Sequence, residues 1–165
     1  RSSGQARIRS FFFFFFAWRI IRSGLASKAF DGGVAKRYPG RWNRQGVPLV
    51  YTSESLALAT LEMLVHLEDW QMMDQYKCIP VDFDENCIQM LTSEEIPADW
   101  RDNPISPSTR LLGTEWVENQ STPVLKVPSS VIPEENNYLI NPDHPDIGEL
   151  TIGTPRPYNF DPRLA

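Results

Sequence analysis

Four polar side chains lie within or beside apolar segments of the chain, and their types suit the binding and cleavage of a nucleotide-like ligand. Arg41 lies in a glycine-containing turn, and Tyr51 ends a short apolar run. Glu62 lies inside an apolar stretch, and Ser129 follows another apolar run. A guanidinium can hold a pyrophosphate with two parallel hydrogen bonds, and an aromatic ring can stack on a base or a nicotinamide. A single carboxylate can stabilise a developing oxocarbenium ion or bind ribose hydroxyls, so the set suggests a nucleotide-like ligand.

Each of these residues also has an ordinary structural interpretation. In an ordinary globular protein, Arg41 would be a surface charge, Tyr51 a half-buried strand residue and Ser129 a turn residue. Glu62 is the hardest to explain in this way, because apolar helices seldom keep an unpaired acid. A pair between Glu62 and His66, one helical turn further on, is its best structural explanation. The residue types alone leave both interpretations open.

Short apolar runs predict the elements that would position these side chains. The expected strands are AWRII (17–21), VPLVY (47–51), KCIPVDF (77–83), PVLKVPS (123–129) and NNYLINP (136–142). A second helix is expected around residues 112–117, and the proline-rich tail is expected to pack as an extended closing segment.

The helix that carries Glu62 is expected to begin after Thr52 or Ser53 as its N-cap, with Glu54 in its first turn, and to end near Asp69. Between residues 56 and 67 its polar members are a threonine, a glutamate and a histidine. Apolar residues therefore point in nearly every direction, which predicts a helix that is buried over most of its surface.

Length and composition indicate one ordinary globular domain. The chain has 165 residues, a net charge of −5 and a pI of about 5.0. This charge argues against a protein that binds nucleic acid directly, which would need a basic surface. The two cysteines, Cys78 and Cys87, are expected to be reduced thiols. With His66 and His144 as the available histidines, no metal site is expected, and His144 is interpreted as a turn residue.

The N-terminal segment requires separate treatment because it contains six consecutive phenylalanines, Phe11 to Phe16. The run is far too short to cross a bilayer, for which a helix needs about 20 apolar residues. We therefore expect residues 1–17 to be an artefactual leader rather than a membrane anchor, and residues 18–165 to form the domain.

The order and spacing of several stretches resemble those of the RES domain, the toxin half of RES–Xre toxin–antitoxin pairs. The likeness covers nearly all of residues 18–164. The matching stretches are WRI at 18–20, AFDG at 29–32, GRWN at 40–43, VYTSESLALATLEMLVHL at 50–67, IPADW at 96–100, GTEW at 113–116, VPSSVIPEENNYLINPDHP at 127–145 and FDPRL at 160–164.

The resemblance implies roles for five residues. The arginine, glutamate and serine that name the family fall on Arg41, Glu62 and Ser129, and the family's active-site tyrosine falls on Tyr51. Arg41, Tyr51 and Glu62 are then expected to be catalytic. Arg41 would also bind the diphosphate, Ser129 would position a hydroxyl or phosphate oxygen, and Arg19 would reach the same pocket. Tyr51 would pack against the nicotinamide end, with Glu62 beneath the ribose, while the tryptophan after Arg41 would pack to hold the turn.

The resemblance also implies a fold and an activity. The expected fold is a single α+β domain with a mixed, split sheet, similar to the ADP-ribosyltransferase toxins. The expected activity is cleavage of the nicotinamide–ribose bond of NAD, by hydrolysis or phosphorolysis, with NAD as substrate and no cofactor. A cognate helix-turn-helix antitoxin of the Xre type would inhibit the toxin in the cytoplasm, within a larger complex that contains a toxin homodimer.

Two alternatives remain open on the sequence. A mono-ADP-ribosyltransferase would keep the fold and transfer ADP-ribose to a host protein. A catalytically silent binding module would keep the fold and only sequester a partner or a nucleotide, although the complete set of four polar residues argues against it.

Overall fold

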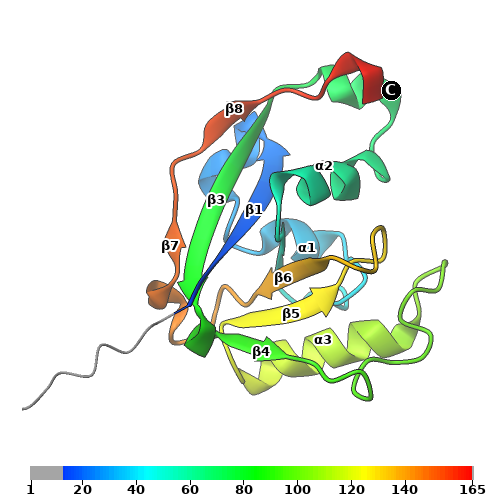
Figure 1. Cartoon of the computed structure of the whole chain (residues 1–165), viewed down its shortest axis with the longest axis vertical. Helices are drawn as coiled ribbons and strands as arrows, with labels where there is room; N and C mark the ends of the chain where they lie inside the picture. The colour runs from blue at the N-terminus through cyan, green and yellow to red at the C-terminus, as the bar shows by residue number, and fades with distance from the viewer. Residues whose placement is uncertain (1–12, 165) are drawn as a thin grey trace, which may run out of the picture.

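The computed structural model describes residues 13–164, which form one curled, mixed sheet with helices against it (Figure 1). The strands are β1 (Phe14–Arg22), β2 (Val50–Ser53), β3 (Tyr76–Asp84), β4 (Ile88–Met90), β5 (Val124–Pro128), β6 (Asn136–Ile140), β7 (Thr151–Ile152) and β8 (Arg156–Tyr158). The helices are α1 (Gly33–Arg37), α2 (Leu56–Leu64) and α3 (Pro107–Asn119). Short 3₁₀ turns are η1 (Ser23–Lys28), η2 (Asp69–Met73), η3 (Glu85–Cys87), η4 (Ile147–Glu149) and η5 (Pro162–Leu164). The five predicted strands and both predicted helices are therefore present.

The sheet has the strand order β4-β5-β6-β2-β1-β3-β7, and β8 also pairs with β3. All neighbouring strands are antiparallel except β4 and β5, which are parallel. The junction between β1 and β2 is the weakest, because their register has one pair of facing residues, Trp18 and Ser53. By contrast, β1 follows β3 along its whole length. The sheet is thus divided into two halves that meet at a single pair, which confirms the predicted α+β fold with a split sheet.

The strand β1 begins earlier than expected. Phe14 faces Asp84 of β3, and the pairing continues without a break to the end of β1. Along this stretch exposed and inward-facing residues alternate, since Ala17 is fully buried and Phe15 stacks on Phe83 at 6.5 Å between ring centroids. Residues 14–17, which we had assigned to the leader, are therefore part of the sheet. The rest of that leader lies outside the described residues, apart from the exposed Phe13.

The helix α2 is shorter and more exposed than the sequence predicts. Its N-cap is Ser55, whose hydroxyl accepts the Leu58 N–H at 3.0 Å, because β2 continues through Thr52 and Ser53 to pair with β6. Glu54 thus precedes the helix. The helix ends at Leu64 rather than near Asp69. Beyond Leu64, hydrogen bonds of the i→i+3 type replace those of the α-helix and tighten the chain. Its buried residues are Leu58 and Ala59, so the expectation of burial over most of its surface is wrong.

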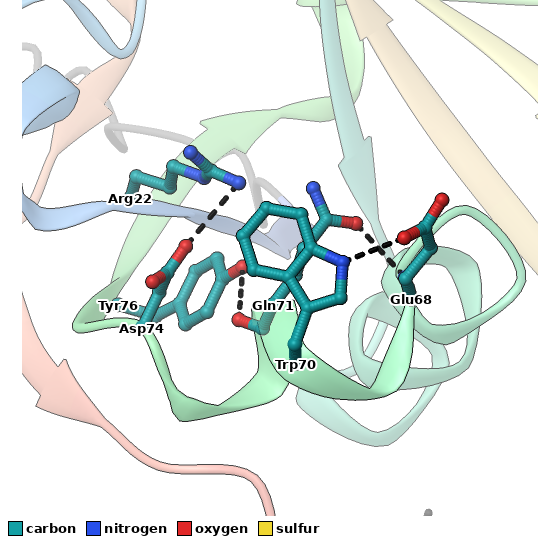
Figure 2. Close-up of polar contacts among 6 residues, drawn as sticks. All are labelled: Arg22, Glu68, Trp70, Gln71, Asp74 and Tyr76. Atoms are coloured by element: carbon teal, nitrogen blue, oxygen red, sulfur yellow. Dashed lines mark hydrogen bonds and ion pairs between the residues drawn. The ribbon is translucent and has the colours of Figure 1, made fainter.

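A compact connection joins α2 to β3 (Figure 2). Glu68 and Gln71 form a reciprocal capping box at the start of η2, and the indole N–H of Trp70 donates to Glu68 at 2.6 Å. The Tyr76 hydroxyl donates to the Gln71 carbonyl at 2.9 Å, which fixes the turn to the first residue of β3. These bonds satisfy backbone groups at the start of η2 and fix the connection that leads from α2 into β3.

The helix α3 covers the other half of the sheet, where it lies along β5 and β4 in Figure 1. Trp116 of α3 packs in one core cluster with Trp42, Leu49 and Leu139. Trp42 is 2 % exposed, so it is a core residue that anchors the turn next to Arg41, as predicted. The approach is close, because a Cβ atom added to Gly113 of α3 would lie 1.8 Å from the Trp42 carbonyl oxygen.

Candidate active site

The Glu62 carboxylate is held by donors from two other elements. The Ser129 hydroxyl donates to Glu62 Oε1 at 2.7 Å, and the Asn137 amide donates to the same oxygen at 2.7 Å. Glu62 lies on α2, Ser129 directly follows β5, and Asn137 is on β6. The second carboxylate oxygen, Oε2, has no hydrogen-bond partner among the described residues. Two bonds on one oxygen fix the orientation of the group and leave the other oxygen open. The alternative pair of Glu62 with His66 is wrong.

Ser129 is fully buried and its hydroxyl is fully used. It donates to Glu62 and accepts the backbone N–H groups of Val131 at 3.1 Å and Ile132 at 3.0 Å. In this arrangement Ser129 holds the carboxylate and its own turn together. The expectation that Ser129 positions a hydroxyl or phosphate oxygen stays a prediction.

Sequence reasoning missed Asn137. Its side-chain oxygen accepts the Ser53 hydroxyl at 2.8 Å while its nitrogen donates to Glu62, so it joins β2 to α2 across β6. The register places Asn137 opposite Ser53, and two polar residues facing each other in paired strands were the available signal. That signal becomes visible only once the pairing of β2 with β6 is known.

Asn43 organises the turn that carries Arg41. Its side-chain oxygen accepts the Gly40 N–H at 2.9 Å and the Tyr51 hydroxyl at 2.7 Å. Its nitrogen donates to the carbonyl groups of Ala35 and Val47, at 2.9 Å and 3.1 Å. Asn43 is fully buried, and these bonds satisfy the whole amide. Sequence reasoning noted the GRWN stretch but gave no role to this residue.

Tyr51 is joined to the same turn. Its hydroxyl oxygen accepts the Trp42 N–H at 3.0 Å while its hydrogen goes to Asn43. Burial raises the pKa of Tyr51, and the hydrogen bond from Trp42 offsets this only in part, so the phenol is neutral at physiological pH. The ring therefore acts as a fixed, uncharged wall next to Arg41, and it is too strongly protonated to serve as a base.

Arg41 is held at one end by a loop from the other side of the site. One terminal nitrogen, Nη1, donates to the carbonyl oxygens of Trp100 at 2.8 Å and Asp102 at 3.0 Å. Burial lowers the pKa of the guanidinium, and the negative charge of Glu62 is the largest influence that opposes it. Arg41 and Glu62 form no direct ion pair among the described residues. The two opposite charges therefore influence each other without direct contact.

Arg19 lies at the junction between the two halves of the sheet. Its Nη1 donates to the Tyr51 carbonyl at 2.9 Å, just beyond the single facing pair of β1 and β2. Burial lowers the pKa of Arg19 to about 10, although the charge of Asp31 opposes this. Its Nε is buried and has no partner among residues 13–164. The structure thus joins Arg19 to Tyr51, and not to Glu62 or Ser129, while it leaves one buried donor unused.

The five predicted residues therefore fall into two connected groups. Glu62 and Ser129 are bonded directly, whereas Arg41, Tyr51 and Arg19 gather around the turn and the end of β2. The β2 strand and Asn137 connect the groups through Ser53. Such an arrangement places a cation, a neutral ring and an oriented carboxylate around one region, which suits a ligand with a negative charge at one end and a reactive sugar at the other.

Two further predictions about side chains can be compared with the structure. Cys78 and Cys87 are both free and buried, as expected. His144 is held in its turn by the Gln120 carbonyl at 3.0 Å and by the Asp146 N–H at 3.0 Å, which confirms a structural role. In the described part of the chain, no helix has the length and hydropathy needed to cross a membrane.

Comparison with known proteins gives a consistent result. The family model described as "RES domain" matches residues 16–161. "Toxin Res" of Yersinia enterocolitica is 35% identical over 148 residues, which cover 89% of this chain and 97% of that protein. "Toxin Res" of Photorhabdus laumondii is 38% identical over 150 residues, with 90% and 96% covered. "Prs ADP-ribosylating toxin" of Sphingobium is 34% identical over 152 residues, with 89% and 94% covered.

A solved structure shares the fold. A chain of the crystal structure of the M. tuberculosis MbcT-MbcA toxin-antitoxin complex superposes with a TM-score of 0.74 at 14% identity. The match covers 93% of this chain and 87% of that one. At this identity the likeness establishes the architecture, including its curled mixed sheet.

Proposed function

The chain belongs to the RES domain family, and on that premise we propose that it is a toxin that consumes NAD by breaking the nicotinamide–ribose bond. The observation that carries the proposal is the Glu62 carboxylate, which Ser129 and Asn137 orient through one oxygen. The free oxygen is then available to the ribose. The relatives named "Toxin Res" support the assignment as a toxin, because they match along nearly their whole length.

In the proposed reaction the substrate lies across the two groups of residues. Arg41 binds the diphosphate with the nitrogens that the loop carbonyls leave free, and Tyr51 borders the nicotinamide end. As the bond between the nicotinamide nitrogen and the anomeric carbon of its ribose breaks, the electron pair leaves with the nicotinamide and positive charge develops on the ribose. The fixed carboxylate of Glu62 stabilises that charge without reorganising, because its donors already hold it. Water or phosphate then bonds to the anomeric carbon, and with water the surplus proton passes to solvent.

The first test is the variant Glu62→Gln. Glutamine has the same shape and retains an oxygen for Ser129 and Asn137, so the fold should survive. The negative charge is lost, and we expect NAD consumption to fall by about 100-fold or more. The measurement is NAD loss over time with purified protein, together with circular dichroism to confirm folding.

Glu54→Gln is the matched control. Glu54 accepts from the Asn136 amide at 3.2 Å, outside the proposed catalytic set, and its variant should retain parental turnover. Glu62→Gln protein that is folded and consumes NAD at the parental rate would exclude this mechanism.

Transfer of ADP-ribose to a protein is the second candidate function. The 34% identical Sphingobium relative, "Prs ADP-ribosylating toxin", favours it. Hydrolysis, phosphorolysis and transfer share the same bond cleavage and differ in the acceptor. Product analysis with labelled NAD separates them: free ADP-ribose indicates water, its 1″-phosphate indicates added phosphate, and a labelled band in a lysate or on purified Prs indicates transfer.

We further propose that a cognate antitoxin with an Xre-type helix-turn-helix domain inhibits this toxin in the cytoplasm. The toxin-antitoxin complex that contains the structural neighbour supports such a partner. A homodimer within a larger complex is the expected assembly. Co-expression with a candidate Xre-type antitoxin should restore growth and yield a co-purifying complex, whose mass by light scattering reports the stoichiometry.

A further inference from the structure

A second arginine lies at the turn that carries Arg41. Arg110, on α3, donates from Nε to the Gly40 carbonyl at 3.0 Å, and Gly40 directly precedes Arg41. Gly40 also touches Tyr51, since a Cβ atom added there would lie 2.6 Å from the tyrosine hydroxyl. Arg110 is thus bonded to the turn that carries Arg41, the proposed diphosphate-binding residue. The proposed reaction does not yet include Arg110.

Neither guanidinium has an acidic partner in contact. The ion pairs of residues 13–164 are Arg22 with Asp74 and Arg163 with Asp161. Arg41 and Arg110 are instead held by neutral backbone carbonyls. Both cations are therefore anchored at or beside the same turn by neutral groups, and no acid of the described residues neutralises either charge by direct contact.

The charges of the two arginines do reach each other. Burial lowers the pKa of Arg41 most, the charges of Glu62, Tyr51 and Asp102 oppose this, and the positive charge of Arg110 is the smallest influence and lowers the pKa further. The charges of both arginines act on the Tyr51 phenol, where they oppose the upward effect of burial on its pKa. Arg41, Arg110 and Tyr51 therefore share one electrostatic environment.

Both arginines retain free donors on the side away from their anchors. A guanidinium has five N–H groups, and Nη1 of Arg41 has given both of its hydrogens to Trp100 and Asp102. Its Nε and Nη2 have no partner in the described part of the chain, and neither do Nη1 and Nη2 of Arg110. Backbone anchors that fix one edge of each group preorganise the other edge to bind an anion.

We propose that Arg110 is a second anion-binding residue, and that Arg41 and Arg110 together hold the two phosphates of a dinucleotide diphosphate, one guanidinium for each phosphate. A diphosphate diester carries two negative charges at neutral pH, which matches two guanidiniums. This inference rests on the proposed function, because it assigns the substrate's diphosphate to a particular pair of residues. It makes Arg110 a substrate-binding residue that acts on affinity rather than on bond cleavage.

The test compares Arg110→Gln with the parent and with Arg37→Gln. Glutamine can still donate to the Gly40 carbonyl, so the turn should survive. Arg37 ends α1, is exposed and loses the same charge, which makes it the matched control. We expect Arg110→Gln to raise the KM for NAD by roughly 10-fold or more with kcat within about twofold, because one charge-assisted contact is lost. Arg37→Gln should behave like the parent.

Binding measured without turnover separates this inference from the proposed function. ADP-ribose titrated by calorimetry should bind Arg110→Gln roughly 10-fold more weakly than the parent, and inorganic pyrophosphate should compete with it in the parent. Arg110→Lys keeps the charge but not the planar fork, so it should recover part of the affinity. If Arg110→Gln does not fold, the affinity of Arg110→Lys for ADP-ribose tests the role of Arg110 in its place.

Each outcome is decisive. If the folded Arg110→Gln variant has the same KM for NAD and the same affinity for ADP-ribose as the parent, the role of Arg110 is wrong and the proposed function stands. A parent that consumes no NAD but binds ADP-ribose in an Arg110-dependent way overturns the proposed function and retains the two-arginine site. A parent that neither cleaves NAD nor binds ADP-ribose overturns both.

Discussion

At the scale of single residues, the site depends on donors that hold an acid in one orientation. Glu62 receives hydrogen bonds from Ser129 and Asn137 on the same oxygen, at 2.7 Å each. Ser129 does two jobs at once, since its hydroxyl also accepts two backbone N–H groups. Its contribution to stability and its contribution to the site can therefore be measured in one variant.

Ser129→Ala should lower both stability and turnover. The substitution leaves the N–H groups of Val131 and Ile132 without their acceptor in a buried turn, which we expect to cost about 1–3 kcal/mol of unfolding free energy. Glu62 keeps the Asn137 donor, so NAD consumption should fall by about 10-fold rather than vanish. Urea denaturation and an NAD assay measure the two effects, and Ser130→Ala serves as the control. Parental stability in Ser129→Ala would show that the turn does not need this hydroxyl.

Residue identity indicated which side chains to examine, while their roles stay predictions. Arg41, Tyr51, Glu62 and Ser129 were singled out by type and position, and the structure does place Glu62 next to Ser129. Asn43 and Asn137 were missed because their value depends on partners far along the chain. An asparagine in a loop or a strand is ordinary until the groups that it bonds are known.

At the scale of elements, α3 supports the Arg41 turn by close contact. Gly113 lets the helix backbone approach the Trp42 carbonyl, and Arg110, one helical turn earlier, bonds to Gly40. The loop between β4 and α3 holds Arg41 from the opposite side through Trp100 and Asp102. The turn is thus fixed between two parts of the same segment, residues 91–119.

Gly113→Ala should destabilise the protein even though alanine favours helices. Helix propensity alone would add about 1 kcal/mol of stability. The new Cβ atom would lie 1.8 Å from a backbone oxygen, however, and α3 must then move away from the turn. We expect a net loss of about 1–3 kcal/mol in thermal or urea unfolding, with a higher KM for NAD because Arg41 is displaced. Gly148→Ala meets nothing within 4 Å and should be neutral, so equal behaviour of the two variants would contradict this account.

Sequence patterns predicted the helices and strands better than they predicted the burial of those elements. The strands were found because their apolar residues alternate or run together, whereas the burial of α2 was overestimated. Leu61 is 38% exposed and Val65 is 58% exposed, since the neighbouring elements cover only one side of the helix. Periodicity describes the residues of a helix and not what packs against it. The start of β1 was missed for a similar reason, because a run of phenylalanines hides the alternation that pairing with β3 imposes.

At the scale of the whole molecule, the buried Cys87 thiol links stability to pH. Burial, the negative charge of Asp84 and the contact with Glu149 together raise the pKa of Cys87 to about 11. The folded protein therefore binds this proton more tightly than the unfolded chain does. The associated stability is complete below the ordinary thiol pKa and is lost as the pH rises through the folded value.

The expected result is a fall in unfolding free energy between about pH 9 and 11 that the Cys87→Ala variant does not share. The difference between parent and variant over this range should be on the order of 2 kcal/mol, after subtraction of their offset at neutral pH. Urea denaturation at a series of pH values measures it. Cys78→Ala is the control, and parallel curves for parent and Cys87→Ala would refute the linkage.

The wide separation of the site residues along the chain has a consequence during synthesis. Glu62 leaves the ribosome well before Ser129 and Asn137, and the outer partners of β3 come later still, at residues 151–158. A growing chain that ends before residue 129 contains Glu62 without either of the donors that orient its carboxylate. Under the proposed function, we expect such an incomplete chain to consume NAD far more slowly than the complete chain does.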